Sequence, residues 1–128
     1  MTRNCVVAGV GPGNGASFTR RFSSAGYQVA MLARNEAYLD ELGGEVADSH
    51  AIGCDVQDPA AVREAFDRVH KTLGSVDVLI YNAGAGEWAS VEETQIEGFE
   101  SSWKTNTLGL LVAAQQVIPA MKERGQGA

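Results

Sequence analysis

The chain has 128 residues, a length that fits one domain, and 45% of them are hydrophobic while 20% are charged, which is typical of a globular rather than a disordered protein. The formal net charge of −6 argues against a nucleic-acid-binding protein, because such a surface needs a basic patch. No apolar run approaches the roughly 18 residues of a membrane span, and glycine and proline interrupt the N-terminal run too early for a signal peptide, so we expect one soluble, cytoplasmic domain over residues 1–128.

A cluster of glycines follows the first apolar run of the chain. The run itself, Arg3–Ala8, has no polar alternation, which is typical of a strand covered on both faces. Between a strand and a helix, glycines let a nucleotide pyrophosphate lie against the main chain, where a Cβ would exclude it. The glycines that can do this are Gly9, Gly11, Gly13 and Gly15. Alone, the turn is a weak signal, and a loop that only needs flexible residues is the alternative.

The next two predicted elements are a helix and a second strand. Apolar side chains recur at helical spacing over residues 16–25, and Gly26 follows where a helix C-terminus commonly has glycine. Asn14 is the expected N-cap of this helix. A second buried strand is predicted over Tyr27–Ala33.

Arg34 directly follows the second predicted strand, about 20 residues beyond the last glycine of the turn. In dinucleotide folds this position meets the adenosine ribose, where an acid binds the free hydroxyl and an arginine accommodates a 2′-phosphate. Neither Ala33 nor Arg34 is acidic, so the pattern favours NADP over NAD. The alternative is that Arg34 is simply a solvated charge at a strand end.

Three further elements are predicted in the middle of the chain. A helix over residues 35–42 is expected to end at Gly43 and Gly44. A short third strand follows over residues 49–54, and a covering helix with one apolar stripe occupies residues 60–72.

Asp55 and Val56 follow the third strand, at the carboxyl edge of the expected sheet. An aspartate there can accept a hydrogen bond from an adenine amino group. A turn or a helix cap is the alternative role for Asp55. Asp58 is the better cap, because Pro59 suits the first helical position after it.

The fourth predicted strand, residues 76–81, runs directly into Asn82, Ala83 and Gly84. An asparagine at a strand end can bond neighbouring main chain and fix the wall of a crevice, while Gly84 lets a ribose come close.

Thr94 and Glu97 form a capping-box pattern ahead of a long apolar stripe. We expect one long or slightly bent helical stretch from there toward Arg124, in which Asn106 is conspicuously polar.

The alternation of strands and helices predicts an α/β fold, a Rossmann-like parallel sheet of order 3-2-1-4 with helices on both faces. The ligand crevice then lies between the first and fourth strands. Cys5 and Cys54 fall inside predicted strands and are expected to be buried free thiols. His50 and His70 have no ligand spacing with them, so no metal site is predicted.

In its motifs the chain resembles the short-chain dehydrogenase/reductase family. The matches are Gly9, Gly13 and Gly15 with the family's T-G-x-x-x-G-x-G turn, Asp55 and Val56 with its adenine-contacting pair, Asn82, Ala83 and Gly84 with its N-N-A-G, and Asn106 with its catalytic asparagine. Ala8 replaces the threonine of the turn, and Tyr81 replaces the first asparagine of N-N-A-G. Asn14 occupies the position at which the family usually has an aliphatic residue beside the cofactor.

The resemblance implies an oxidoreductase that transfers hydride between a nicotinamide cofactor, here NADP, and a carbonyl or alcohol. In the family a fifth strand carries a catalytic serine and the next helix a Tyr-x-x-x-Lys pair, and this sequence contains no Tyr-x-x-x-Lys. The expectation is therefore the cofactor-binding portion of such an enzyme, truncated before the fifth strand and inactive by itself.

Two other classes of function are possible from the residues. A non-catalytic nucleotide-binding or interaction module is the main alternative. A methyl-donor-binding domain is disfavoured, because it would have an acid rather than Arg34 after the second strand. An unpaired edge at residues 76–81 and an apolar stripe over residues 110–121 further predict a homo-oligomer or association with a C-terminal fragment.

Overall fold

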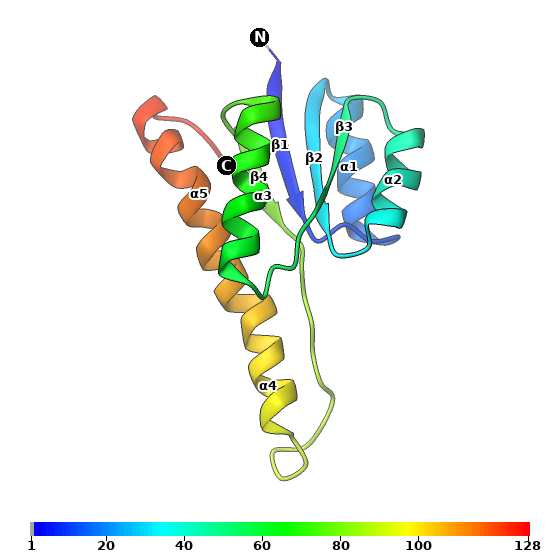
Figure 1. The fold of residues 1–128 in the computed structure, drawn as a ribbon, viewed down its shortest axis with the longest axis vertical. Coiled ribbons are helices and arrows are strands. Elements are labelled where there is room, and N and C mark those ends of the chain that lie inside the picture. Colours follow the sequence, from blue (N-terminus) through cyan, green and yellow to red (C-terminus); the bar gives the residue numbers. More distant parts are fainter. Residues whose placement is uncertain (1) are drawn as a thin grey trace.

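A parallel sheet of four strands, covered by helices on both faces, forms the body of the protein in the computed structural model, which describes residues 2–128 (Figure 1). The strands are β1 (Arg3–Ala8), β2 (Tyr27–Ala33), β3 (Ser49–Gly53) and β4 (Val78–Tyr81). Their order is β3-β2-β1-β4 and each pairing is parallel, which confirms the predicted order 3-2-1-4.

The helices of the described residues 2–128 connect the strands and follow the last one. They are α1 (Asn14–Ser24), α2 (Glu36–Glu45), α3 (Pro59–Leu73), α4 (Ile96–Trp103), the π-helical segment η1 (Lys104–Leu108) and α5 (Gly109–Arg124). The last three form one continuous helical stretch, as predicted. Figure 1 shows that α4 and the segment before it extend beyond the sheet, while α5 runs back alongside the sheet.

The side chains of β1 alternate between two buried clusters, one on each face of the sheet. Val6 belongs to the cluster that includes Phe66 of α3 and Val117 of α5. Val7 belongs to the cluster on the other face, with Leu39 of α2. Because both faces of the strand are covered, a continuous apolar run forms it, as the sequence predicts.

Two predicted helix starts are wrong. Asn14 is the first residue of α1, and Gly13 holds the N-cap position with no side-chain cap. The capping box at Thr94 and Glu97 does not form, because Gln95 is the N-cap of α4 and the Thr94 hydroxyl donates to a carbonyl of the preceding turn at 2.7 Å. The start of α3, by contrast, is as predicted.

The second helix does not end at its two glycines. It continues through Gly43 and Gly44 to Glu45. Neither glycine has a positive φ, and the left-handed residue of the following turn is Asp48, at φ 54°. Each interior glycine costs the helix about 1 kcal/mol relative to alanine. Burial of Leu42 in the same helix offsets part of that cost.

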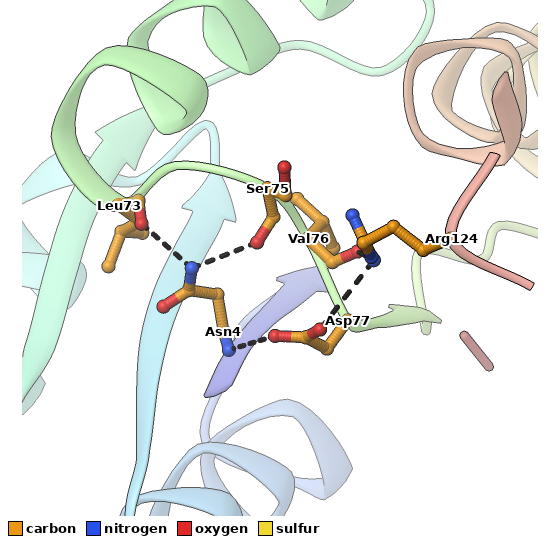
Figure 2. Close-up of polar contacts among 6 residues, drawn as sticks. All are labelled: Asn4, Leu73, Ser75, Val76, Asp77 and Arg124. Atoms are coloured by element: carbon orange, nitrogen blue, oxygen red, sulfur yellow. Dashed lines mark hydrogen bonds and ion pairs between the residues drawn. The ribbon is translucent and has the colours of Figure 1, made fainter. Parts of the chain in front are cut away.

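A polar cluster joins β1 to the segment before β4 and to the end of α5 (Figure 2). Its members are Asn4, Leu73, Ser75, Val76, Asp77 and Arg124. The Asn4 N–H donates to the Asp77 carboxylate at 2.8 Å, and the Asn4 side-chain amide donates to the carbonyls of Leu73, the last residue of α3, and Ser75. Arg124 donates to the Val76 carbonyl at 2.9 Å and lies 3.6 Å from Asp77. A side chain therefore engages the Val76 carbonyl, and β4 begins at Val78 rather than at the predicted residue 76.

The outer edge of β4 forms two backbone hydrogen bonds with Ala128. The Leu79 N–H donates to the Ala128 carbonyl at 2.8 Å, and the Ala128 N–H donates to the Asp77 carbonyl at 3.0 Å. Figure 1 shows the end of the described chain near this strand. The expectation of a wholly unpaired edge is wrong at this position.

Cys5 and Cys54 are buried and free, as predicted. Burial raises the pKa of Cys5 to about 12. Burial, together with the nearby Asp55 and Asp58 carboxylates, raises the pKa of Cys54 to about 11. Within residues 2–128 no helix is long and apolar enough to cross a membrane, and no cluster of His, Cys, Asp and Glu could hold a metal ion.

Candidate functional site

A cavity of about 950 Å³ lies at the carboxyl ends of the strands. All of the residues predicted to bind a cofactor line it: Gly9, Gly11, Gly13, Asn14, Gly15, Arg34, Asp55, Val56, Asn82, Ala83 and Gly84. They come from the segments that follow all four strands. The parallel sheet therefore brings together residues that are more than 70 positions apart in the chain, at the place where open α/β sheets bind ligands.

The glycines of the turn have two different structural roles. Gly9 has a φ of +97°, and a Cβ there would collide with the backbone of Ala83. A Cβ at Gly15 would likewise collide with the Gly9 carbonyl, so both glycines are needed for main-chain packing. Gly11 and Gly13 have no atom within 4 Å of the position of a Cβ, so they leave an open main-chain surface beside the first turn of α1. The first N–H groups of a helix have no intrahelical partner, and an anion can bind there.

Asn82 joins the turn to the end of β4. Its side-chain amide donates to the Gly9 carbonyl at 2.9 Å. The N–H groups of Asn82 and Ala83 donate to the Ala8 carbonyl at 2.8 and 2.9 Å. The predicted hydrogen bond of the Asn82 side chain with neighbouring main chain is present.

Arg34 and Asp55 are the charged residues that line the cavity, and both are exposed. No ion pair among the described residues 2–128 involves Arg34. One carboxylate oxygen of Asp55 accepts the Gln57 N–H at 3.0 Å, so the turn role that the sequence left open is present. The second oxygen of Asp55 has a free lone pair for another donor.

Asn106 lies in the π-helical segment, and its side chain bonds both backbone polar groups of Ala85. Its Oδ1 accepts the Ala85 N–H at 2.9 Å, and its Nδ2 donates to the Ala85 carbonyl at 2.6 Å. Ala85 lines the cavity and Asn106 does not. Asn106 is exposed, and it lies beside the lining, bonded to Ala85 and directly after Thr105 in the chain.

Three contacts of the site were not predicted from the sequence. Gln57 donates from its side-chain amide to the hydroxyls of Ser101 and Thr105, both at 2.9 Å. The Tyr81 hydroxyl donates to the Thr105 carbonyl. Burial, with a smaller contribution from Cys54, raises the pKa of Tyr81 to about 12. The available sequence signal was the spacing of Ser101 and Thr105, which are four residues apart and therefore share one face of the predicted helix.

The comparisons with known proteins agree with this geometry. The sequence profile of the short chain dehydrogenase family matches residues 3–128. The chain belongs to the short-chain dehydrogenase/reductase family. Family membership accounts for the glycine turn, the strand order and the position of Asn82 together, because all three form one dinucleotide-type crevice.

Three relatives indicate how far the likeness extends. D-threitol dehydrogenase of Mycolicibacterium smegmatis is 32% identical over 127 residues, 96% of this chain and 49% of that protein. NADP-dependent 3-hydroxy acid dehydrogenase YdfG of Escherichia coli O6:H1 is 33% identical over 124 residues, 95% of this chain and 50% of that protein. The crystal structure of 3-ketoacyl-(acyl-carrier-protein) reductase from Brucella melitensis, complexed with NADH, is 28% identical, with a TM-score of 0.90 over 96% of this chain and 52% of that chain. The chain spans about half the length of the relatives it matches.

Proposed function

We propose that residues 1–128 form the NADP-binding part of an oxidoreductase that transfers hydride between a nicotinamide cofactor and a carbonyl or alcohol. The observation that carries the preference for NADP is Arg34, an exposed guanidinium at the cavity lining with no ion-pair partner among residues 2–128. A guanidinium binds a phosphate through charge-assisted hydrogen bonds, whereas an NAD site has an acid at this position. The NADP-dependent relative from Escherichia coli agrees with this preference.

The turn fits the pyrophosphate of such a cofactor. Gly11 and Gly13 offer main chain without a Cβ, and α1 directs its first N–H groups to the same place. On the adenosine side, the second carboxylate oxygen of Asp55 would accept an adenine amino group, with Val56 beside it. Gly84 leaves room for a ribose.

The described residues bind and orient, while the bound nicotinamide supplies or accepts the hydride. Asn106, the catalytic asparagine by resemblance, holds the cavity wall through Ala85. The chain contains no Tyr-x-x-x-Lys, and a positioned proton donor typically contributes about 10²–10⁴-fold to rate. We therefore expect residues 1–128 alone to give no NADPH-dependent reduction of a panel of ketones above background. Turnover by a homogeneous sample would contradict this.

The exposed apolar side chains of α4 and α5 support a partner for the chain. They are Ile96, Phe99, Trp103, Leu110, Leu111 and Ile118. Exposed apolar side chains that gather on one helical stretch are typical of an interaction surface. We propose that a second copy, or a C-terminal fragment, covers it.

Calorimetric titration tests the cofactor assignment. NADP and NAD are titrated separately into the same preparation of the chain. Tighter binding of NADP supports the proposal. Equal or tighter binding of NAD would contradict it.

A further inference from the structure

Thr105 is the residue through which the turn after β3 and the last residue of β4 both contact the helical stretch that carries Asn106. It is only 8% exposed and directly precedes Asn106 in η1. Its hydroxyl accepts a hydrogen bond from Gln57, and its carbonyl accepts one from the Tyr81 hydroxyl. Gln57 lies two residues after Asp55, and Tyr81 lies directly before Asn82. Both contacts therefore come from segments that also line the cavity.

The hydrogen bonds of η1 explain why the Thr105 carbonyl can accept a side-chain donor. In an α-helix the Gly109 N–H would donate to the carbonyl four residues back, which is that of Thr105. Here the Gly109 N–H donates to the Lys104 carbonyl, five residues back. A side chain that inserts into the helical ladder is a known cause of such an irregularity. The Tyr81 hydroxyl occupies this place.

Gly109 provides the space for this contact. A Cβ at Gly109 would collide with the Tyr81 hydroxyl and would lie 2.7 Å from the Val56 carbonyl. The Tyr81 hydroxyl at the end of β4 can therefore approach the helix only because Gly109, at the start of α5, has no side chain. One turn earlier, the same helix presents Asn106 to Ala85.

We infer that Tyr81 and Gln57 are positioning residues, which act through Thr105 to set the π-helical segment so that the Asn106 side chain meets Ala85 at the cavity wall. The importance of this placement for cofactor binding rests on the proposed function. The placement itself is a property of the chain without cofactor. It can therefore be tested whether or not NADP binds.

Backbone amide exchange, measured residue by residue by NMR on the cofactor-free chain, tests the inference. The Ala85 N–H reports the Asn106 contact, whereas the Ala83 N–H, bonded to Ala8, reports the sheet. Tyr81→Phe should accelerate Ala85 exchange by about fivefold, the factor expected for one lost hydrogen bond of ordinary strength, and should leave Ala83 unchanged. The matched control is Tyr38→Phe, on α2 at the other face of the sheet, which should change neither amide.

A second variant, Thr105→Val, removes the hydroxyl that Gln57 contacts and retains the carbonyl that Tyr81 contacts. It should also accelerate Ala85 exchange, by a smaller factor. Unchanged Ala85 exchange in both variants would overturn the inference. Equal acceleration of Ala83 and Ala85 would also overturn it, because Tyr81 would then stabilise the sheet as a whole and not the Asn106 contact.

Discussion

The Asn106 side chain bonds both backbone polar groups of Ala85, accepting its N–H at 2.9 Å and donating to its carbonyl at 2.6 Å. The two residues are 21 positions apart, at opposite ends of the exposed segment and helix that extend beyond the sheet. The Asn106 side chain therefore joins the beginning of the segment that follows β4 to the helical stretch beyond α4. The same side chain keeps Ala85 against the cavity.

Asn106→Ala should release Ala85 without unfolding the protein. Ala85 amide exchange should accelerate at least about fivefold, because the bond protecting that amide is lost. The free energy of unfolding should change by less than about 1 kcal/mol, since alanine has the higher helix propensity and offsets part of the loss. Asn35→Ala should show the reverse pattern, because it removes the side-chain cap of α2 at a cost of about 1 kcal/mol and does not affect Ala85. Unchanged Ala85 exchange in Asn106→Ala would contradict the assigned contact.

Two glycine-to-alanine substitutions in helices should have opposite effects. Gly109→Ala should destabilise the chain by about 1–3 kcal/mol, because the new Cβ meets the Tyr81 hydroxyl and the Val56 carbonyl. Gly44→Ala should stabilise it by up to about 1 kcal/mol, because nothing lies within 4 Å and the backbone is helical. Urea denaturation of both variants measures the difference. An unchanged free energy of unfolding in Gly109→Ala would contradict the close approach of the Tyr81 hydroxyl to Gly109.

Stability should fall at alkaline pH because of the two buried thiols. Burial raises the pKa of Cys5 to about 12 and that of Cys54 to about 11, from an ordinary value of 9.0. The unfolded chain therefore loses these protons first, and the free energy of unfolding decreases as the pH rises from about 9 toward 11. Below about pH 8 the thiols contribute no pH dependence.

Alanine at both cysteines provides the control for this prediction. The variant should show a flatter decrease between about pH 9 and 11, because neither state then has a thiol to ionise. Tyr81, with its pKa raised to about 12, acts in the same direction at the upper end, so the slope should not vanish. An identical slope in the variant and the parent chain would exclude the thiols as the cause.

The exposed stripe on α4 and α5 predicts association. In sedimentation experiments at micromolar concentration, the chain should be a dimer or larger. Trp103→Glu should shift it toward monomer, because the substitution places a charge in the stripe, where Trp103 is 48% exposed. Ala37→Glu, on α2 at the other side of the sheet, adds the same charge and should leave the mass unchanged. A well-dispersed monomeric parent chain would refute the prediction.

The sequence was sufficient for the elements whose pattern is local. Arg3–Ala8 and Tyr27–Ala33 each contain a short uninterrupted apolar run, and both strands have the predicted bounds. Strand order follows from the alternation of strands and helices, and it places every predicted cofactor residue around one cavity.

The remaining features depend on tertiary contacts that no local pattern contains. Gly43 and Gly44 are typical of a helix end. In the structure α2 nevertheless continues to Glu45, with Leu39 and Leu42 buried. The N-cap of α1 is Gly13 rather than the predicted Asn14, because the glycine turn that precedes the helix determines where its first residue lies. The contacts of Thr105 with Tyr81 and Gln57 span 24 and 48 residues, so only the folded sheet brings the three together.

The role of Arg34 as the ligand of a 2′-phosphate is the central claim, and calorimetric selectivity between NADP and NAD tests it most directly. The parent chain should bind NADP more tightly. Arg34→Ala should weaken NADP binding by about 1–3 kcal/mol, as the loss of charge-assisted hydrogen bonds does, and should leave NAD binding nearly unchanged. Arg63→Ala, which removes the same charge from the exposed surface of α3, should retain the parent's selectivity. Unaltered selectivity in Arg34→Ala, or a parent chain that prefers NAD, would contradict the account.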